Sequence, residues 1–281
     1  MVFGEWFSLG LSGSAGTIDA VNEPDLRALM RLHIPEEFHS EIELTVREGL
    51  RLRHAREDDS VIGYFGGLPQ LPDGFAWPGA DHGHDQHVAT IDLATLPKLD
   101  VNLPASGTIS VFGDTNGWAG ACLYFPHDVA LNEAPLPTDL AERNGIISRV
   151  DMTYAVVETI PDAQWFEENL LDGNDHDDEV YEGFEAFGEA FFTHSWAWHQ
   201  LGGWANEIQG QRDRGLLPGT AAERHFYHDF EPSGPLLLAQ FDTDPEINMG
   251  WGDFGTLYCF ITPQDLAVHD FTKVSVHWES Y

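Results

Sequence analysis

A run of glycine and proline residues from Ile62 to Pro78 constrains this chain more than any other stretch. Its sequence, IGYFGGLPQLPDGFAWP, sets these residues between large aromatic side chains. Proline fixes φ and glycine permits positive φ, so neither a regular helix nor a central strand fits here. A disordered linker rarely carries so many aromatic residues. We therefore predict an ordered loop, buried on its aromatic side, whose structural motif is Gly66, Gly67, Pro69, Pro72, Gly74, Trp77 and Pro78.

The string GGLPQLPDGFAWP (66–78) resembles the signature of the YwqG-like family, a bacterial domain of unknown function. Segments 87–112, 199–210 and 236–281 are similar to the rest of that pattern, so the resemblance covers roughly residues 45–281. One departure is that Gly63 and Tyr64 stand where the family usually has a small polar and a basic residue. The resemblance implies a fold but no agreed activity. Some members are thought to lie beside secreted-toxin genes, which implies a toxin-neutralising role by analogy.

The last third of the chain repeats short patterns from the middle. Gly202-Gly203 matches Gly66-Gly67, AQFD (239–242) matches ATID (89–92), and GTLYCF (255–260) matches GTISVF (107–112). Three matches in the same order favour an internal duplication. We predict an α+β fold of mostly antiparallel strands, built from two related strand-rich halves at about 45–160 and 196–281. Within these halves the β-branched and aromatic segments 87–93, 108–112, 121–125 and 149–160 are predicted strands.

Helices are expected outside the two halves. Residues 1–20 are rich in glycine and serine and predict a flexible start, after which 21–281 should form a single domain. Asn22 and Pro24 are typical of a helix start, and a second helix is predicted from Pro35 to a stop at Gly49. Residues 162–195 predict an acidic insertion with helices near 163–171 and 178–191.

The charge of the chain excludes some partners. It has 47 acidic and 13 basic residues, a net charge of −34. Such a surface repels nucleic acid phosphates and anionic lipids. Two explanations stay open: adaptation of the whole surface to salt, or an acidic face that docks a basic protein. The segment from Asp162 to Glu189 suits the second, because it holds many carboxylates and no lysine or arginine.

Two clusters have the residue types of metal ligands. DHGHDQH (81–87) places His82, His84 and His87 near Asp81 and Asp85, as zinc ligands can be placed, but its glycine and polar residues favour a solvated turn. DGNDHDDE (172–179) has the oxygen density that Ca²⁺ prefers without the spacing of an EF-hand. We therefore predict no metal and no other cofactor.

Acid–base groups suggest an enzymatic alternative. Asp92 and Asp242 each end a matching predicted strand, and two carboxylates meeting between the halves could transfer protons with His199. Either aspartate could instead cap the turn that follows it. Trp77, Trp196, Trp198 and Trp204 could line a ligand groove or pack in the core.

Known catalytic motifs are missing, including Gly-x-Ser-x-Gly, the P-loop, Cys-x-x-Cys and His-Glu-x-x-His. The sequence therefore favours a non-enzymatic binding protein, with an enzyme using Asp92, Asp242 or His199 as the alternative. The N-terminus lacks a basic region and carries Glu5, and Cys122 and Cys259 lie in apolar segments. Both features favour a cytoplasmic protein with reduced thiols. The sequence does not predict an oligomeric state.

Overall fold

The computed structural model describes residues 24–81, 83–114, 120–142, 146–171, 176–192, 198–208 and 235–281. Its centre is an antiparallel ten-stranded sheet in the order β12-β11-β10-β9-β1-β8-β2-β4-β5-β6. The strands are β1 (Arg47–His54), β2 (Gly63–Phe65), β4 (Gln86–Asp92), β5 (Thr108–Gly113), β6 (Gly120–Phe125), β8 (Val150–Thr159), β9 (Gln200–Gly202), β10 (Leu236–Asp242), β11 (Thr256–Ile261) and β12 (Ser275–Glu279). The prediction of a mostly antiparallel α+β fold is therefore confirmed.

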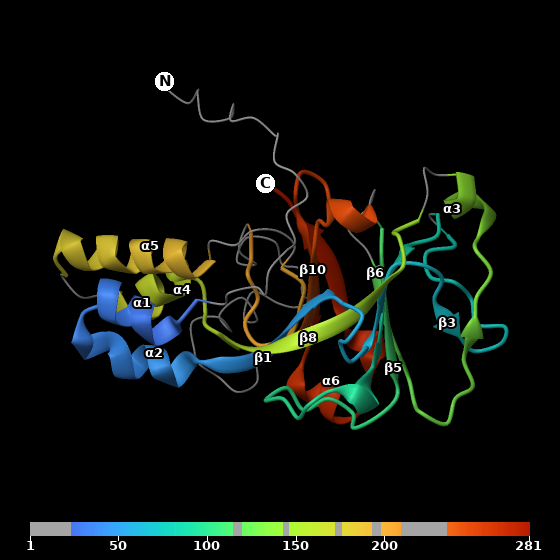
Figure 1. The fold of residues 1–281 in the computed structure, drawn as a ribbon, viewed down its shortest axis with the longest axis horizontal. Coiled ribbons are helices and arrows are strands. Elements are labelled where there is room, and N and C mark those ends of the chain that lie inside the picture. The colour runs from blue at the N-terminus through green and yellow to red at the C-terminus, as the bar shows by residue number, and fades with distance from the viewer. Residues whose placement is uncertain are drawn as a thin grey trace, which may run out of the picture.

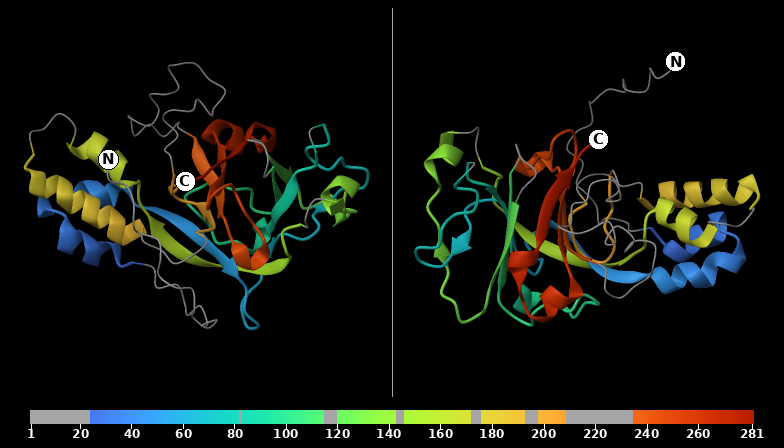
Figure 2. Two further views of the ribbon diagram at one scale, coloured as in Figure 1. Left: turned by 90° about the horizontal axis from the view of Figure 1, so that it is seen from above. Right: turned by 180° about the vertical axis from the view of Figure 1, so that it is seen from behind.

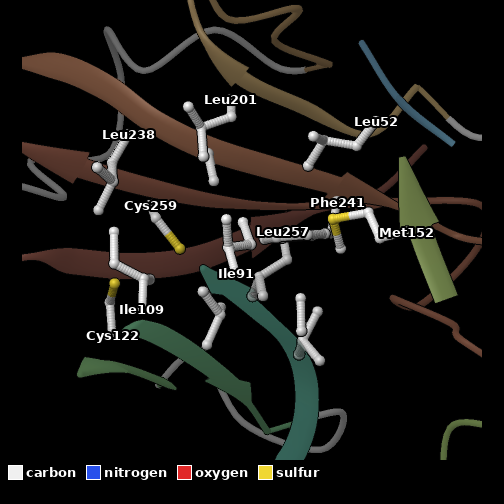
Figure 3. Packing of buried hydrophobic residues seen from close by; sticks show 14 of the residues in the cluster. Leu52, Ile91, Ile109, Cys122, Met152, Leu201, Leu238, Phe241, Leu257 and Cys259 are labelled. Atoms are coloured by element: carbon white, nitrogen blue, oxygen red, sulfur yellow. The ribbon is translucent and has the colours of Figure 1, made fainter. Parts of the chain in front are cut away.

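The sheet curls until its two edge strands approach each other. Gly120 in β6 lies against Val276 in β12, and the indole N–H of Trp278 donates to the carbonyl of Asp114 at 3.1 Å. This nearly closed sheet surrounds the main apolar core. Figure 3 shows strands from both ends of the chain contributing to that core, including the buried thiols of Cys122 and Cys259.

A group of helices, which we call the helical unit, lies at one end of the molecule (Figures 1 and 2). It combines α1 (Leu26–His33), a 3-10 turn (Glu36–Phe38) and α2 (His39–Thr45) with α4 (Ala163–Phe166), a π-helical turn (Glu167–Leu171) and α5 (Asp178–Phe192). Its own apolar core joins Phe184, Phe187 and Phe191 of α5 to Met30 and Ile42. The predicted N-terminal helices and the helices of the acidic insertion are thus present, and they pack together.

The ends of the first two helices differ from the prediction. Asp25 caps α1 by accepting the N–H of Ala28 at 2.9 Å, while Asn22 lies outside the described residues. Gly49 does not end a helix: it lies in β1, opposite Gly202, where an added Cβ would come within 3.2 Å of the Gly202 carbonyl oxygen. Close approach of two strands explains this glycine better than helix termination does.

The Gly/Pro stretch is ordered, as predicted. The prediction that it holds no central strand is wrong for its start: Gly63–Phe65 form β2, between β8 and β4, because the prolines begin only at Pro69. Tyr64, Phe65 and Trp77 are buried, whereas Phe75 is 43% exposed. The Trp77 indole donates to the Asp85 carbonyl at 2.7 Å. Within the loop, β3 (Gln70–Leu71) pairs with β7 (Asn132–Glu133), and α3 (Thr138–Glu142) follows nearby at the end of the molecule opposite the helical unit (Figure 1).

The β4–β5 and β10–β11 pairs have similar registers. Asp92 lies opposite Thr108, and Asp242 lies opposite Thr256. Each pair contains a register shift three to five residues before its aspartate, between His87 and Ala89 or between Leu237 and Ala239. The glycine pair after β2 and the pair at the end of β9 both have positive φ, between 57° and 73°. Among the helices described, none has the length and apolarity needed to cross a bilayer.

Candidate functional site

The clearest candidate site is a cluster of two histidines that share one buried carboxylate. His54 ends β1, His199 precedes β9, and Asp244 follows β10 at the start of a 3-10 turn, η6 (Pro245–Ile247). His54 Nε2 lies 2.9 Å from Asp244 Oδ2, and His199 Nε2 lies 3.4 Å from the same oxygen. Pairing of β1 with β9, and of β9 with β10, brings these distant residues to one place.

The hydrogen bonds of His199 define its protonation. Its Nδ1 accepts the backbone N–H of Asp242 at 3.1 Å, so this nitrogen carries no proton. The proton of the neutral ring therefore resides on Nε2 and is donated to Asp244. A nitrogen that carries a proton cannot also offer a lone pair to a metal ion, which argues against a metal between the two imidazoles.

The cluster shifts the pKa of two of its members. The hydrogen bond with Asp244 raises the pKa of His54 above its ordinary value, against the opposing effect of burial. Burial alone would raise the pKa of Asp244, but hydrogen bonds from His199 and His54 outweigh it and hold this pKa well below the usual range. Asp244 is therefore an anion throughout the physiological pH range.

Only part of the cluster reaches solvent. The side chains of Asp244 and His199 are 6% and 2% exposed, whereas that of His54 is 29% exposed. His54 Nδ1 lies 3.6 Å from a carboxylate oxygen of the exposed Glu246. Phe65 contacts both imidazoles, with ring centroids 5.6 Å from His54 and 4.8 Å from His199. His54 is thus the member through which the cluster can exchange protons.

The acid–base residues expected from the sequence have separate surroundings. Asp92 is exposed and accepts the N–H of Ala94 at 3.0 Å, which caps the turn after β4. The Asp242 carboxylate accepts the N–H of Trp198 and the hydroxyl of Thr256. Asp242 and His199 do meet, but through the Asp242 backbone rather than its carboxylate.

Two of the four tryptophans, Trp198 and Trp204, lie under arginine side chains. The guanidinium of Arg51, itself buried, lies 3.8 Å above the Trp198 ring, and that of Arg47 lies 3.7 Å above the Trp204 ring. Gln200 accepts hydrogen bonds from both Arg51 and the Trp198 indole. Trp77 belongs to the core under the Gly/Pro loop. Trp196 lies outside the described residues.

The histidines of the 81–87 cluster point to different neighbours. His84 bonds to Asp139 at 2.7 Å, beside an open depression of about 670 Å³ lined by Ala80, Gly83 and Pro135–Asp139. His87 is buried against the Gly66 carbonyl and the Thr90 hydroxyl, and burial lowers its pKa to about 4. His82 and residues 172–175 are outside the described part, within which no group of three or more His, Cys, Asp or Glu residues is arranged to hold a metal ion.

The outward face of α5 is acidic along its length. The helix buries Phe184, Phe187 and Phe191, and its exposed charged residues are Asp178, Glu179, Glu182, Glu185 and Glu189. Exposed carboxylates also occur over the rest of the molecule, for example at Glu57, Glu133 and Glu142. The helical unit therefore concentrates a charge that the whole surface shares.

Sequence reasoning found His199 but missed His54 and Asp244. These two residues are separated by 190 positions, and neither lies in a recognisable motif. The available signals were weak: a histidine ending a strand of alternating arginines, and an aspartate two residues after the strand-ending Asp242. Only the order of the strands brings them together.

The comparisons with known proteins identify a family. A search of curated proteins gave no match. A family model described as a domain of unknown function, DUF1963, matches residues 64–280. This match runs from Tyr64, within β2, to the end of β12 and leaves β1, α1 and α2 outside. The resemblance to the YwqG-like family is consistent with this match. The chain therefore belongs to the DUF1963 family of domains of unknown function.

Proposed function

We propose that this protein is a non-enzymatic binding protein whose helical unit docks a basic protein partner. The observation that carries the proposal is the outward face of α5, whose exposed charged side chains are all carboxylates. They recur at helical spacing along the 15-residue helix, so they form a stripe rather than a scattered set. Such a stripe attracts a partner with clustered lysine and arginine residues and speeds its association.

A helical peptide with lysines on one face tests this proposal. Binding to the intact protein is measured by calorimetry at low salt and again near about 0.15 M salt. We expect binding at low salt that weakens as the salt rises, because the contact is between exposed charges. A peptide of the same length with glutamates in place of the lysines should not bind.

A matched pair of variants locates the contact. The first neutralises Glu179, Glu182 and Glu185 of α5 as glutamines. The second makes the same change at Glu57, Glu133 and Glu142, which are exposed elsewhere. Both lose the same net charge, so only a contact on α5 separates them. Equal binding of the peptide by the two variants would contradict the proposal and favour a general effect of net charge.

An enzymatic role is the second candidate, favoured by the His54–Asp244 pair. A buried carboxylate that orients a partly exposed imidazole is an arrangement suited to proton transfer. The strongly negative charge disfavours anionic substrates, so a neutral ester such as p-nitrophenyl acetate is the suitable probe. We expect His54→Gln to slow its hydrolysis at least about tenfold if the pair is catalytic, with His127→Gln as the control. Equal rates would eliminate this candidate.

We further propose that the sheet derives from two related halves of YwqG-like type. The sheet order supports this. From the centre of the sheet to one edge the strands are β2, β4, β5 and β6, and from the centre to the other edge they are β9, β10, β11 and β12, so both sides run outward in chain order. The matching registers place His199 at the position of Gly63, and Asp244 at that of Ala94. The His199–Asp244 contact would then be a feature of the second half alone, while His54 comes to the cluster from β1, in the first half.

A finer form of the proposal concerns the partner and its location. A basic toxin neutralised in the bacterial cytoplasm would fit the acidic face and the resemblance to YwqG-like proteins. This form rests on analogy and charge. Its test is a growth assay in which a candidate toxin is expressed with the wild-type protein or with the α5 variant. Rescue by both proteins alike would contradict a role for the acidic face.

A further inference from the structure

The contact between His54 and Asp244 joins two parts of the fold that are far apart in the chain. His54 ends β1, in the middle of the sheet. Asp244 begins the turn of residues 244–249, in which its N–H and carbonyl both bond to Met249. The Asp244 carboxylate also caps the turn by accepting the N–H of Glu246 at 3.0 Å. A change in the charge of His54 therefore alters a contact that stabilises this turn.

The 244–249 turn also contacts a third segment, residues 147–148. The backbone N–H of Ser148 donates to the Ile247 carbonyl at 2.7 Å, which fixes the chain just before β8. Ile147 is buried in the main core beside this contact, and its carbonyl accepts the N–H of Gly67. A change in the 244–249 turn would thus reach the Gly/Pro loop as well as the entry to β8.

His54 is the group of the cluster that can change its charge. Nδ1 of His199 is occupied as the acceptor of the Asp242 N–H, and Asp244 stays ionised. The two nitrogens of His54 face two carboxylates, Asp244 at 2.9 Å and Glu246 at 3.6 Å. A second proton on the ring therefore places a cation between two anions.

The other neighbours of His54 do not oppose that cation. Phe65 lies edge-on to the ring, and the residue opposite on β8 is Met152. Arg53, which precedes His54, forms an ion pair with Asp59 at 2.8 Å. Asp151, next to Met152, forms an ion pair with Arg149 at 3.9 Å. The two carboxylates at η6 thus favour the protonated imidazole.

We propose that His54 and Asp244 form a proton-operated latch between β1 and the 244–249 turn, closed while the imidazole is doubly protonated. Loss of the second proton leaves the hydrogen bond to Asp244 in place and removes its ionic part. The latch then weakens without breaking, and the turn and the Ser148 contact open more often. This inference is independent of the proposed binding function, because it involves neither α5 nor a partner.

Nuclear magnetic resonance of the intact protein tests the latch directly. The titration of His54 should have its midpoint above the 6.5 of an ordinary histidine. Amide exchange at Glu246 and Ser148, corrected for the intrinsic effect of pH, should quicken as the pH rises through that midpoint. Each unit by which the midpoint exceeds 6.5 corresponds to about a tenfold change in the opening equilibrium.

Two variants and a control separate the latch from general effects of pH. Glu246→Gln removes the exposed carboxylate and should lower the His54 midpoint without unfolding the protein. His54→Gln keeps a donor for Asp244 but no titratable ring, and should make exchange at Glu246 and Ser148 independent of this midpoint. His127→Gln, at an exposed site, should behave like the wild type. A wild-type midpoint at or below 6.5, or unchanged exchange across it, would overturn the proposal.

Discussion

At the scale of single residues, the environment sets the charge of each histidine differently. His87 is enclosed by the Gly66 carbonyl and the Thr90 hydroxyl, which suit a neutral ring with one donor and one acceptor. His54 faces two carboxylates, which suit a charged ring. The same side chain therefore stabilises the fold at high pH in one place and at low pH in the other.

The buried His87 gives the first prediction. Because burial lowers its pKa from 6.5 to about 4, the unfolded chain binds a proton at a pH where the folded protein does not. The stabilisation is complete above 6.5 and is lost as the pH falls toward 4, by up to about 3 kcal/mol. Urea unfolding at a series of pH values should show this slope in the wild type and a smaller one in His87→Asn. Equal slopes would show that His87 is protonated in the folded state.

Gly66 gives the second prediction. It has φ of +57°, and an added Cβ would lie 2.5 Å from the carbonyl oxygens of Ile147 and Ser148. Backbone atoms cannot move aside as a flexible side chain can, so Gly66→Ala should cost about 4 kcal/mol or more. Gly74 is the control, since it has φ of +76° with nothing within 4 Å of an added Cβ. Gly74→Ala should cost about 1–2 kcal/mol, and similar costs at both sites would refute the crowding at Gly66.

At the scale of elements, the Gly/Pro loop covers the outer side of β5 and β6. Trp77 packs at 75° to the Phe112 ring and bonds to the Asp85 carbonyl, which anchors both the apolar body and the polar tip of the indole. Leu71, Phe125 and Leu140 complete this cluster. We therefore expect the stability of this cluster to depend more on Trp77 than on the exposed Phe75.

Replacement of Trp77 tests that dependence. Trp77→Ala should lower the free energy of unfolding by about 3–5 kcal/mol, because it removes a large buried ring. Phe75→Ala, where the ring is 43% exposed, should cost about 1 kcal/mol. Urea melts of both variants give the comparison. A loss below about 1 kcal/mol at Trp77 would favour a ligand-binding role for this tryptophan instead.

Local sequence patterns predicted the helices and strands better than they predicted which strands pair. The strand at 121–125 and the helix near 178–191 were expected from composition and periodicity, and the structure has β6 and α5 there. The long pairing of β1 with β8 and the insertion of β9 beside β1 were not expected. They depend on contacts between residues far apart in the chain, such as Arg47 with Thr159 and Gly49 with Gly202, which no local pattern encodes.

The candidate site was missed for the same reason. His199 was expected to act with the carboxylates of Asp92 and Asp242. The Asp242 carboxylate turns instead to the N–H of Trp198 and the Thr256 hydroxyl, both close to the strand end. These local donors occupy the oxygens of the Asp242 carboxylate, so it does not bond to the His199 imidazole. Asp244, two residues later, is left to meet His54.

At the scale of the whole molecule, the net charge of −34 gives the last prediction. Exposed carboxylates repel one another more in the compact state than in the extended chain, and salt screens this repulsion. The melting temperature should therefore rise from low to molar salt. Neutralising Glu179, Glu182 and Glu185 should reduce that rise more than neutralising Glu57, Glu133 and Glu142, because the α5 carboxylates lie on adjacent turns of one helix. A melting temperature that falls with added salt would contradict this account.

The approach of β6 to β12 has a consequence for how the protein behaves at high concentration. A sheet normally presents two rows of unpaired peptide groups, to which a strand of another molecule can add. Here the two edge strands, β6 and β12, approach each other, and Gly120 lies against Val276 at the seam. Each edge therefore hinders the addition of a foreign strand to the other. A bulky residue at Gly120 would part the seam and expose both edge strands, so we expect it to promote aggregation.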